Sequence, residues 1–95
     1  MAIARVVTFE DVDQERIDGL RSRIESEGGP PPDVPAHEIL ILHDPEGSRS
    51  LAILFFETED DYRRGDAALS AMPADETPGR RASVQRYEVA LRRSM

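Results

Sequence analysis

The segment "HEILILHDPEGSRSLAILFFET", residues 37–58, decides the fold because it joins two apolar runs through a turn. The runs His37–Asp44 and Ser50–Thr58 are rich in isoleucine, leucine and phenylalanine, as β-strands are. Between them, "DPEG" at 44–47 places Asp, Pro and Gly at the first, second and fourth positions of a type I turn. We therefore expect these two strands to form an antiparallel hairpin.

The residues upstream of this hairpin predict a strand followed by a helix. The first run, Met1–Phe9 ("MAIARVVTF"), is β-branched and apolar and is typical of a strand. Within residues 10–29, Ile17, Leu20 and Ile24 recur at the spacing of one helix face. We expect an amphipathic helix there.

The two ends of this helix have signals of their own. Asp11, with Gln14 three residues later, fits a capping box, and Asp13 is a second candidate for the N-cap. Gly28–Gly29 is a typical helix stop. The stretch "PPPDVP" at 30–35 could be a ligand motif for an SH3-like domain, but a rigid crossover loop accounts for it more simply.

A second helix and a fourth strand follow the hairpin. Thr58, with Asp61 three residues later, predicts a capped helix that runs to about Met72. After a loop with a Pro-Gly turn, Ser83–Leu91 ("SVQRYEVAL") predicts the last strand. The expected order is βαββαβ in a single domain, residues 1–95.

The tripeptide Arg64-Gly65-Asp66 lies within the second helix. An adhesion motif presents both charged side chains from an exposed loop, whereas Arg64 and Asp66 project about 160° apart on a helix. Tyr62, Gly65 and Leu69 fall on one stripe of that helix. A glycine on the buried stripe predicts a close approach of the helix to the sheet. We therefore interpret the tripeptide as one side of an ordinary helix.

The two middle strands do not alternate polar and apolar residues. In Glu38–Leu42 and in Leu51–Phe56, positions on either side of the strand are apolar, which predicts that both faces of the sheet are covered. Right-handed crossovers would place both helices on the same face. A second copy packed sheet to sheet would bury the other face, so the sequence predicts a homodimer.

The composition excludes several classes of function. The 95 residues carry a formal net charge of −7 and form no basic stripe, so we expect no nucleic-acid partner. No apolar run approaches the roughly 20 residues of a membrane span, and no signal peptide is recognisable, so we expect a cytoplasmic protein without a membrane partner. Cysteine and lysine are absent, which excludes disulfides, thiolate chemistry and lysine Schiff bases.

The order of elements and the two-faced sheet, from "ARVVTF" (4–9) to "SVQRYEVAL" (83–91), resemble the dimeric α/β-barrel superfamily. The chain is most similar to its small antibiotic-biosynthesis monooxygenase-like members, and the resemblance covers essentially the whole sequence. It implies an α+β, ferredoxin-like βαββαβ fold with a four-stranded antiparallel sheet, paired into a dimeric α/β barrel. It also implies a small aromatic or apolar ligand, with cofactor-independent monooxygenase or isomerase activity.

The resemblance leaves it open whether the chain is an enzyme at all. Haem-degrading relatives typically use Asn, Trp and His, and this sequence contains neither Asn nor Trp, which argues against that activity. The alternative hypothesis is a non-enzymatic structural or protein-interaction module. A regulatory effector-binding domain ranks last, because it predicts an adjoining functional domain.

Five residues are candidates for lining a ligand cavity: Arg5, Tyr62, Arg86, Tyr87 and Glu88. Arg5 lies among apolar residues, where a charge must be paired or reach water. The first and fourth strands are neighbours in a ferredoxin-like sheet, so Arg5 could pair with Glu88. That pair could be structural, or it could bind an anionic or phenolic ligand. Tyr62 and Tyr87 could equally be core residues.

The remaining polar residues give weaker signals, and we expect no cofactor and no metal site. His37 and His43 lie about 20 Å apart along one strand, too far to bind one metal ion within a protomer. Each fits an ordinary role at a strand end. Arg80 and Arg81 follow the Pro-Gly turn and could clamp a carboxylate or belong to a solvated turn.

Overall fold

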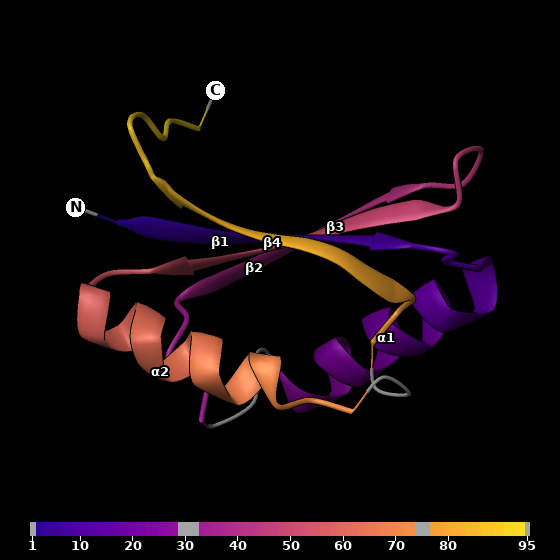
Figure 1. Ribbon diagram of the computed structural model, residues 1–95, viewed down its shortest axis with the longest axis horizontal. Helices are drawn as coiled ribbons and strands as arrows, with labels where there is room; N and C mark the ends of the chain where they lie inside the picture. Colours follow the sequence, from indigo (N-terminus) through magenta and orange to yellow (C-terminus); the bar gives the residue numbers. More distant parts are fainter. Residues whose placement is uncertain (1, 29–32, 74–76, 95) are drawn as a thin grey trace.

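The computed structural model describes residues 2–28, 33–73 and 77–94. The crossover prolines at 30–32 and loop residues 74–76 lie outside these ranges, so the predictions made for them are not tested. The elements are, in chain order, β1 (Ile3–Glu10), α1 (Gln14–Glu27), β2 (Glu38–Asp44), β3 (Arg49–Phe56), α2 (Glu59–Ser70) and β4 (Arg80–Glu88) (Figure 1).

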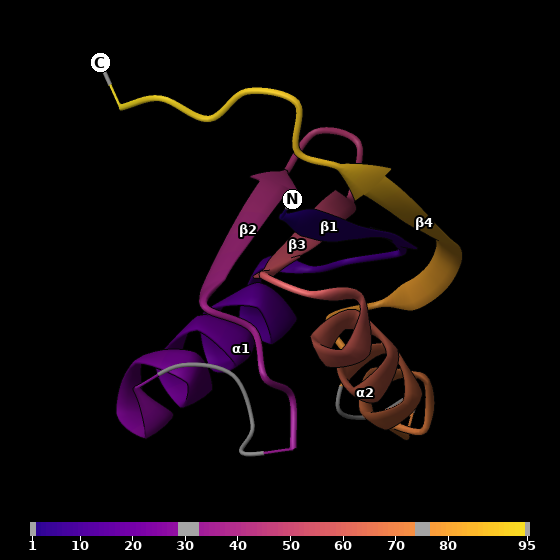
Figure 2. The same cartoon turned by 90° about the vertical axis from the view of Figure 1, so that its left-hand side faces the viewer.

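The four strands form one antiparallel sheet in the order β2-β3-β1-β4. Both helices lie on the same side of this sheet, which leaves its other side without a helix (Figure 2). This arrangement is the predicted α+β, ferredoxin-like fold. Within the described residues, no helix is long and apolar enough to cross a membrane.

The ends of α1 follow from its capping residues. Of the two N-cap candidates, Asp13 is the cap: its Oδ1 accepts a hydrogen bond from the backbone N–H of Arg16 at 2.8 Å. Gly28 ends the helix with φ 77°, a left-handed conformation that glycine adopts without steric cost. Its N–H donates to the carbonyl oxygen of Ile24 at 2.9 Å.

The start of α2 is as predicted, since Oγ1 of Thr58 accepts from the N–H of Asp61 at 3.1 Å. The helix ends at Ser70, two residues before the predicted end. Gly65 is buried at its middle: a Cβ there would lie 2.4 Å from Cε1 of Phe56. The predicted close approach of the helix to the sheet is therefore confirmed.

The β2–β3 hairpin is also confirmed, with its loop at residues 45–48. The Asp44 carboxylate accepts from the N–H of Gly47 at 3.1 Å, and Ser48 has φ 52°. The hydrogen bond from the Gly47 N–H, supported by the one from Arg49, lowers the pKa of Asp44 against the opposing effect of desolvation.

The last strand differs from its predicted bounds at both ends. The strand begins at Arg80, three residues earlier than predicted. The register shifts between Thr8 and Phe9, and beyond this shift Arg80 pairs with Glu10. It ends at Glu88, and the chain then leaves the sheet edge after Val89, whose N–H donates to the Ala2 carbonyl oxygen. The tail that follows lies on the helix-free side of the sheet (Figure 1, Figure 2).

That helix-free side remains apolar and partly exposed. Leu40 and Leu42 of β2 are 42% and 45% exposed. The tail covers part of this side, because the Arg92 guanidinium stacks 4.4 Å from the ring centroid of Phe55 and pairs with Glu38. The sheet thus has one side packed against helices and another that keeps large apolar side chains in contact with solvent.

The core on the helix side consists of two clusters of buried residues. The first contains Val7, Phe9, Val12, Ile17 and Ala52, and the second contains Val34, Leu54 and Phe56. The only buried residue of α1 is Ile17, close to its N-terminus. The rest of the α1 stripe is less tightly packed, and this determines where the site lies.

Candidate functional site

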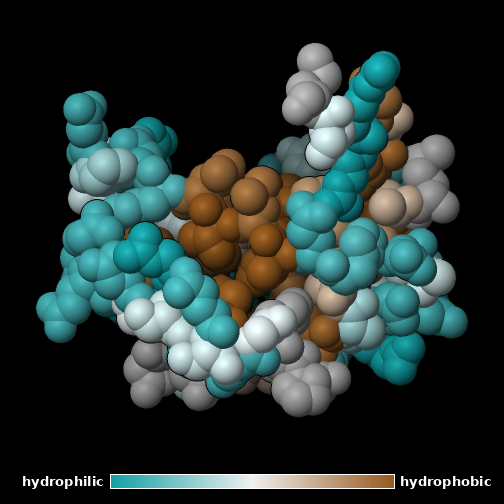
Figure 3. All heavy atoms as spheres, turned by 180° about the vertical axis from the view of Figure 1, so that it is seen from behind, coloured by the Kyte–Doolittle hydropathy of each residue, from teal (hydrophilic) through white to brown (hydrophobic). Residues whose placement is uncertain are grey.

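A cavity of about 580 Å³ lies between the two helices and the helix-covered side of the sheet. From β1, β2 and β3 its apolar lining comprises Val7, Phe9, Ile39, Ile41, Ala52 and Leu54. Seen from the side opposite to Figure 1, apolar residues gather in the middle of the molecule around a hollow (Figure 3).

The cavity exists because α1 packs closely only at its first turns. Leu20 and Ile24 share the helical stripe of the buried Ile17, yet both are only half-buried, and both line the cavity. On the opposite wall are Leu69 of α2 and Met72 just beyond it. The apolar stripes of the two helices therefore border a space that no side chain of the described residues fills.

The polar residues that line the cavity are mostly cationic. Among the described residues they are Arg5, Arg23, Glu27, Thr77 and Arg81, so three guanidinium groups and one carboxylate line the cavity in a chain whose net charge is −7. The cavity therefore has a charge of the opposite sign to the chain as a whole. A ligand with a negative group suits it better than a cation would.

Arg5 is the most deeply placed of these groups, with a side chain only 3% exposed. Its Nε donates to Oδ1 of Asp66 at 2.9 Å, and one terminal nitrogen donates to Oγ of Ser70 at 3.5 Å. Both partners come from α2, and Asp66 is 39% exposed. A buried guanidinium is thus held by a carboxylate that keeps part of its hydration.

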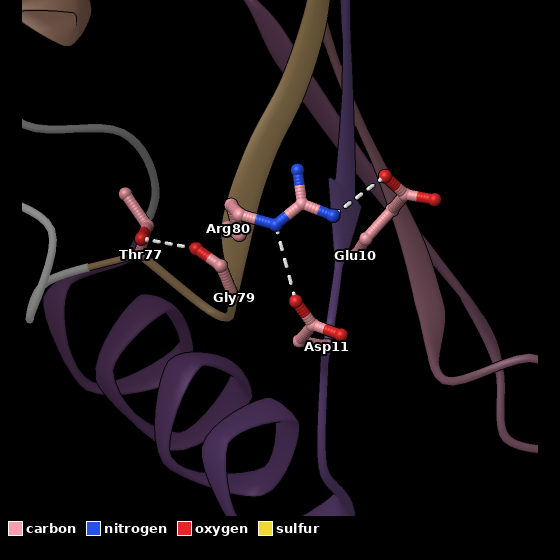
Figure 4. Close-up of polar contacts among 5 residues, drawn as sticks. All are labelled: Glu10, Asp11, Thr77, Gly79 and Arg80. Carbon is pink, nitrogen blue, oxygen red and sulfur yellow. Dashed lines mark hydrogen bonds and ion pairs between the residues drawn. The ribbon is translucent and has the colours of Figure 1, made fainter.

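Arg80 and Arg81 follow the Pro-Gly turn. They are consecutive residues of β4, so their side chains point to opposite sides of the sheet. Arg80 faces solvent and pairs with Glu10 at 3.0 Å and with Asp11 at 3.1 Å (Figure 4). Arg81 faces the cavity, where a terminal nitrogen donates to the carbonyl oxygen of Leu69 at 3.2 Å. Arg80 is neutralised by two carboxylates, whereas no carboxylate of the described residues pairs with Arg81.

Tyr62 and Arg86 lie together between α2 and β4. The Arg86 guanidinium donates to Oε2 of Glu59 at 2.9 Å and lies 5.6 Å from the ring centroid of Tyr62. The Tyr62 ring packs edge-on against Phe56, with 5.8 Å between ring centroids. Burial, and then the charge of Asp66, raises the pKa of Tyr62 above its usual value. The hydrogen bond that Arg86 donates to Glu59 raises the pKa of Arg86.

The five predicted site residues are therefore divided among three places. Arg5 lines the cavity, and Tyr62 and Arg86 form a neighbouring cluster that does not. Tyr87 belongs to the helix-free side, 52% exposed, and its hydroxyl donates to Gln85 at 2.9 Å. Glu88 is exposed at the end of β4.

The predicted pair between Arg5 and Glu88 is wrong. The register places Arg86 opposite Arg5, while Glu88 lies opposite Ile3. The carboxylate that pairs with Arg5 comes instead from Asp66, on the helix packed against the strand.

Sequence reasoning missed Asp66 and did not distinguish Arg81 from Arg80. Asp66 follows Tyr62 by four residues and precedes Ser70 by four, so these three side chains share one helix face, a signal that the sequence contains. Arg81 was considered only together with Arg80. Its inward direction follows from the register shift between Thr8 and Phe9, which places Arg81 opposite Phe9 on the helix-covered side of the sheet.

The histidines do not form a site with these residues. His37 lies 3.5 Å from Arg92 of the tail, and Nε2 of His43 is buried without a hydrogen-bond partner in the described part of the chain. Within that same part, no group of three or more histidine, aspartate or glutamate side chains could hold a metal ion.

Comparisons with protein-family models and with curated proteins found no match to this sequence.

Proposed function

We propose that this chain binds a small, largely apolar organic ligand in the cavity between its helices and its sheet, as a homodimeric barrel of the monooxygenase-like type. The observation that carries the proposal is the cavity itself. Its volume of about 580 Å³ lies within the roughly 300–1,000 Å³ of small-molecule sites. Such sites combine mostly apolar walls with a few placed polar groups, as this one does.

The resemblance also implies a reaction of the bound ligand, a cofactor-independent oxidation or isomerisation. A cofactor-free oxidation or isomerisation needs an acid or base beside the ligand. Tyr62 and Arg86 are engaged with each other and with Glu59 outside the cavity lining. Glu27 is the carboxylate in the described part of the lining, so it is the first group to substitute if turnover is detected.

The second part of the proposal is that another copy of the chain covers the helix-free side of the sheet. The exposed Leu40 and Leu42, with the half-buried Leu51, Ile53 and Phe55, support it, because large apolar patches on a soluble domain are commonly interfaces. A two-fold dimer would bury the same patch on both copies. The alternative, an interaction module, would cover this side with a different protein.

Native mass spectrometry of the protein purified without denaturant tests both parts at once. We expect the mass of two chains, with a small additional mass on part of the dimer. A monomer without added mass would contradict the proposal, and a complex with a different protein would support the interaction module.

A substitution that fills the cavity tests whether the molecule that adds mass to the dimer is bound there. Ile24→Trp on α1 places a larger ring at a half-buried lining position, and the bound mass should disappear. Ser22→Trp is the matched control, because Ser22 is exposed on the same helix and does not line the cavity. Loss of the bound mass in both variants would show that the ligand lies elsewhere.

A further inference from the structure

We propose that the cavity is selective for an anionic ligand, a carboxylate on an apolar or aromatic body, and that Arg81 together with Arg5 binds its charged group. This inference rests on the proposed function and adds the chemical class of the ligand. It depends on where the two guanidinium groups lie, on what already neutralises them, and on the contrast with Arg80.

The two guanidinium groups both line the cavity and both reach the last turn of α2. Arg5, from β1, reaches Oγ of Ser70 at 3.5 Å. Arg81, from β4, reaches the carbonyl oxygen of Leu69 at 3.2 Å. Leu69 and Ser70 are consecutive residues in the last turn of α2, so two arginine side chains from different strands both reach that turn.

Within the described residues, the positive charge at the last turn of α2 is only partly balanced. Asp66 pairs with Arg5, whereas no carboxylate of the described residues pairs with Arg81. The negative end of the α2 dipole contributes about half a charge, which leaves an excess of positive charge. The other charged residues of the described lining, Arg23 and Glu27, have opposite signs and cancel in net charge.

A structural role for Arg81 is to cap the C-terminal turn of α2, which has no basic residue of its own. That role uses one N–H of the five that a guanidinium offers. A carboxylate can take two parallel hydrogen bonds from the remaining donors, and such charge-assisted pairs are stronger than neutral ones. The apolar walls then hold the body of the ligand.

Binding of 2-naphthoate and of its neutral analogue 2-naphthamide, measured by calorimetric titration, tests this inference. The two compounds share shape and apolar area and differ in charge. We expect the native chain to bind the acid at least about tenfold more tightly than the amide, as one or two charge-assisted hydrogen bonds would give. In Arg81→Gln this ratio should fall to near one.

Arg80→Gln is the matched control, because it removes the same charge from the adjacent residue on the solvent side of β4. It should keep the preference for the acid. A further variant, Arg81→Lys, keeps the charge but not the paired donors, and we expect an intermediate ratio.

The outcomes separate this inference from the proposed function. Equal binding of acid and amide by the native chain overturns the anion preference and leaves the cavity as a neutral site. An acid preference that survives Arg81→Gln, or that Arg80→Gln removes equally, overturns the assignment to Arg81. If neither compound binds, the proposed function fails, and this inference fails with it.

Discussion

Arg5 of β1 and Asp66 of α2 form the ion pair that joins the sheet to its second helix. The Nε–Oδ1 distance is 2.9 Å, and the Arg5 side chain is 3% exposed. The two residues are 61 positions apart in sequence. The same arginine lines the cavity, so one side chain both fixes the helix and contributes charge to the candidate site.

Removing the carboxylate of this pair should destabilise the fold. In Asp66→Ala the Arg5 guanidinium stays buried without its charged partner, and we expect a loss of about 1–3 kcal/mol in the free energy of unfolding. Urea denaturation measures it. The control is Asp18→Ala, which breaks an exposed pair with Arg21 and should change stability by no more than about 0.5 kcal/mol. Equal effects of the two substitutions would contradict this account of Arg5.

Two glycines in helices should respond to alanine with opposite signs. Alanine favours a helix by about 1 kcal/mol over glycine. At Gly65 the added Cβ would meet the fully buried Phe56 ring at 2.4 Å, so we expect a net loss of about 1–2 kcal/mol. At Gly19 a Cβ would meet nothing within 4 Å, so Gly19→Ala should stabilise the protein by about 0.5–1 kcal/mol. Thermal unfolding of both variants checks the signs.

Much of the fold could be predicted because local signals agree with it. The apolar runs around "DPEG" indicate the hairpin, Thr58 caps the second helix, and Gly65 on its stripe indicates the close approach to the sheet. In each case the information lies within a few residues of the feature it predicts.

The site could be predicted only in part, because its geometry depends on contacts between layers. Arg5 was identified as a charge that needs a partner, but the partner comes from a helix packed across the sheet, which strand order does not specify. The inward direction of Arg81 depends on a register shift between Thr8 and Phe9. The cavity itself depends on how closely α1 packs, and helical spacing indicates only which side faces the sheet.

Tyr62 should release its phenolic proton at a higher pH than an ordinary tyrosine does. Burial and the Asp66 charge raise its pKa above 10.0. The tyrosinate absorbance, followed as pH rises, should therefore contain a step above the pH at which an ordinary tyrosine titrates. This step should be absent in Tyr62→Phe. The sign for stability follows: above pH 10 the unfolded chain releases this proton while the folded chain keeps it. Folding stability thus decreases as pH rises from 10 toward the raised pKa. A titration unchanged by Tyr62→Phe would show that the phenol is not perturbed.

A charge on the helix-free side should separate the proposed dimer. Leu42 is 45% exposed within one protomer, so Leu42→Asp should leave the protomer folded while placing carboxylates in an apolar interface. Light scattering after size-exclusion chromatography should report half the native mass for this variant. Ser22→Asp, at an exposed position of α1, should keep the native mass. A native protein that is already monomeric would remove the basis for the dimer.

The central claim is that the cavity between helices and sheet binds a small ligand, and the most direct test locates the bound molecule. Two-dimensional ¹⁵N–¹H spectra would be recorded while 2-naphthoate is added to labelled protein. We predict that the largest saturable shifts fall on residues around the cavity, such as Ile24, Leu54 and Arg81. Tyr87, on the helix-free side, should shift least. Saturable shifts centred on that side, or none anywhere, would contradict the account.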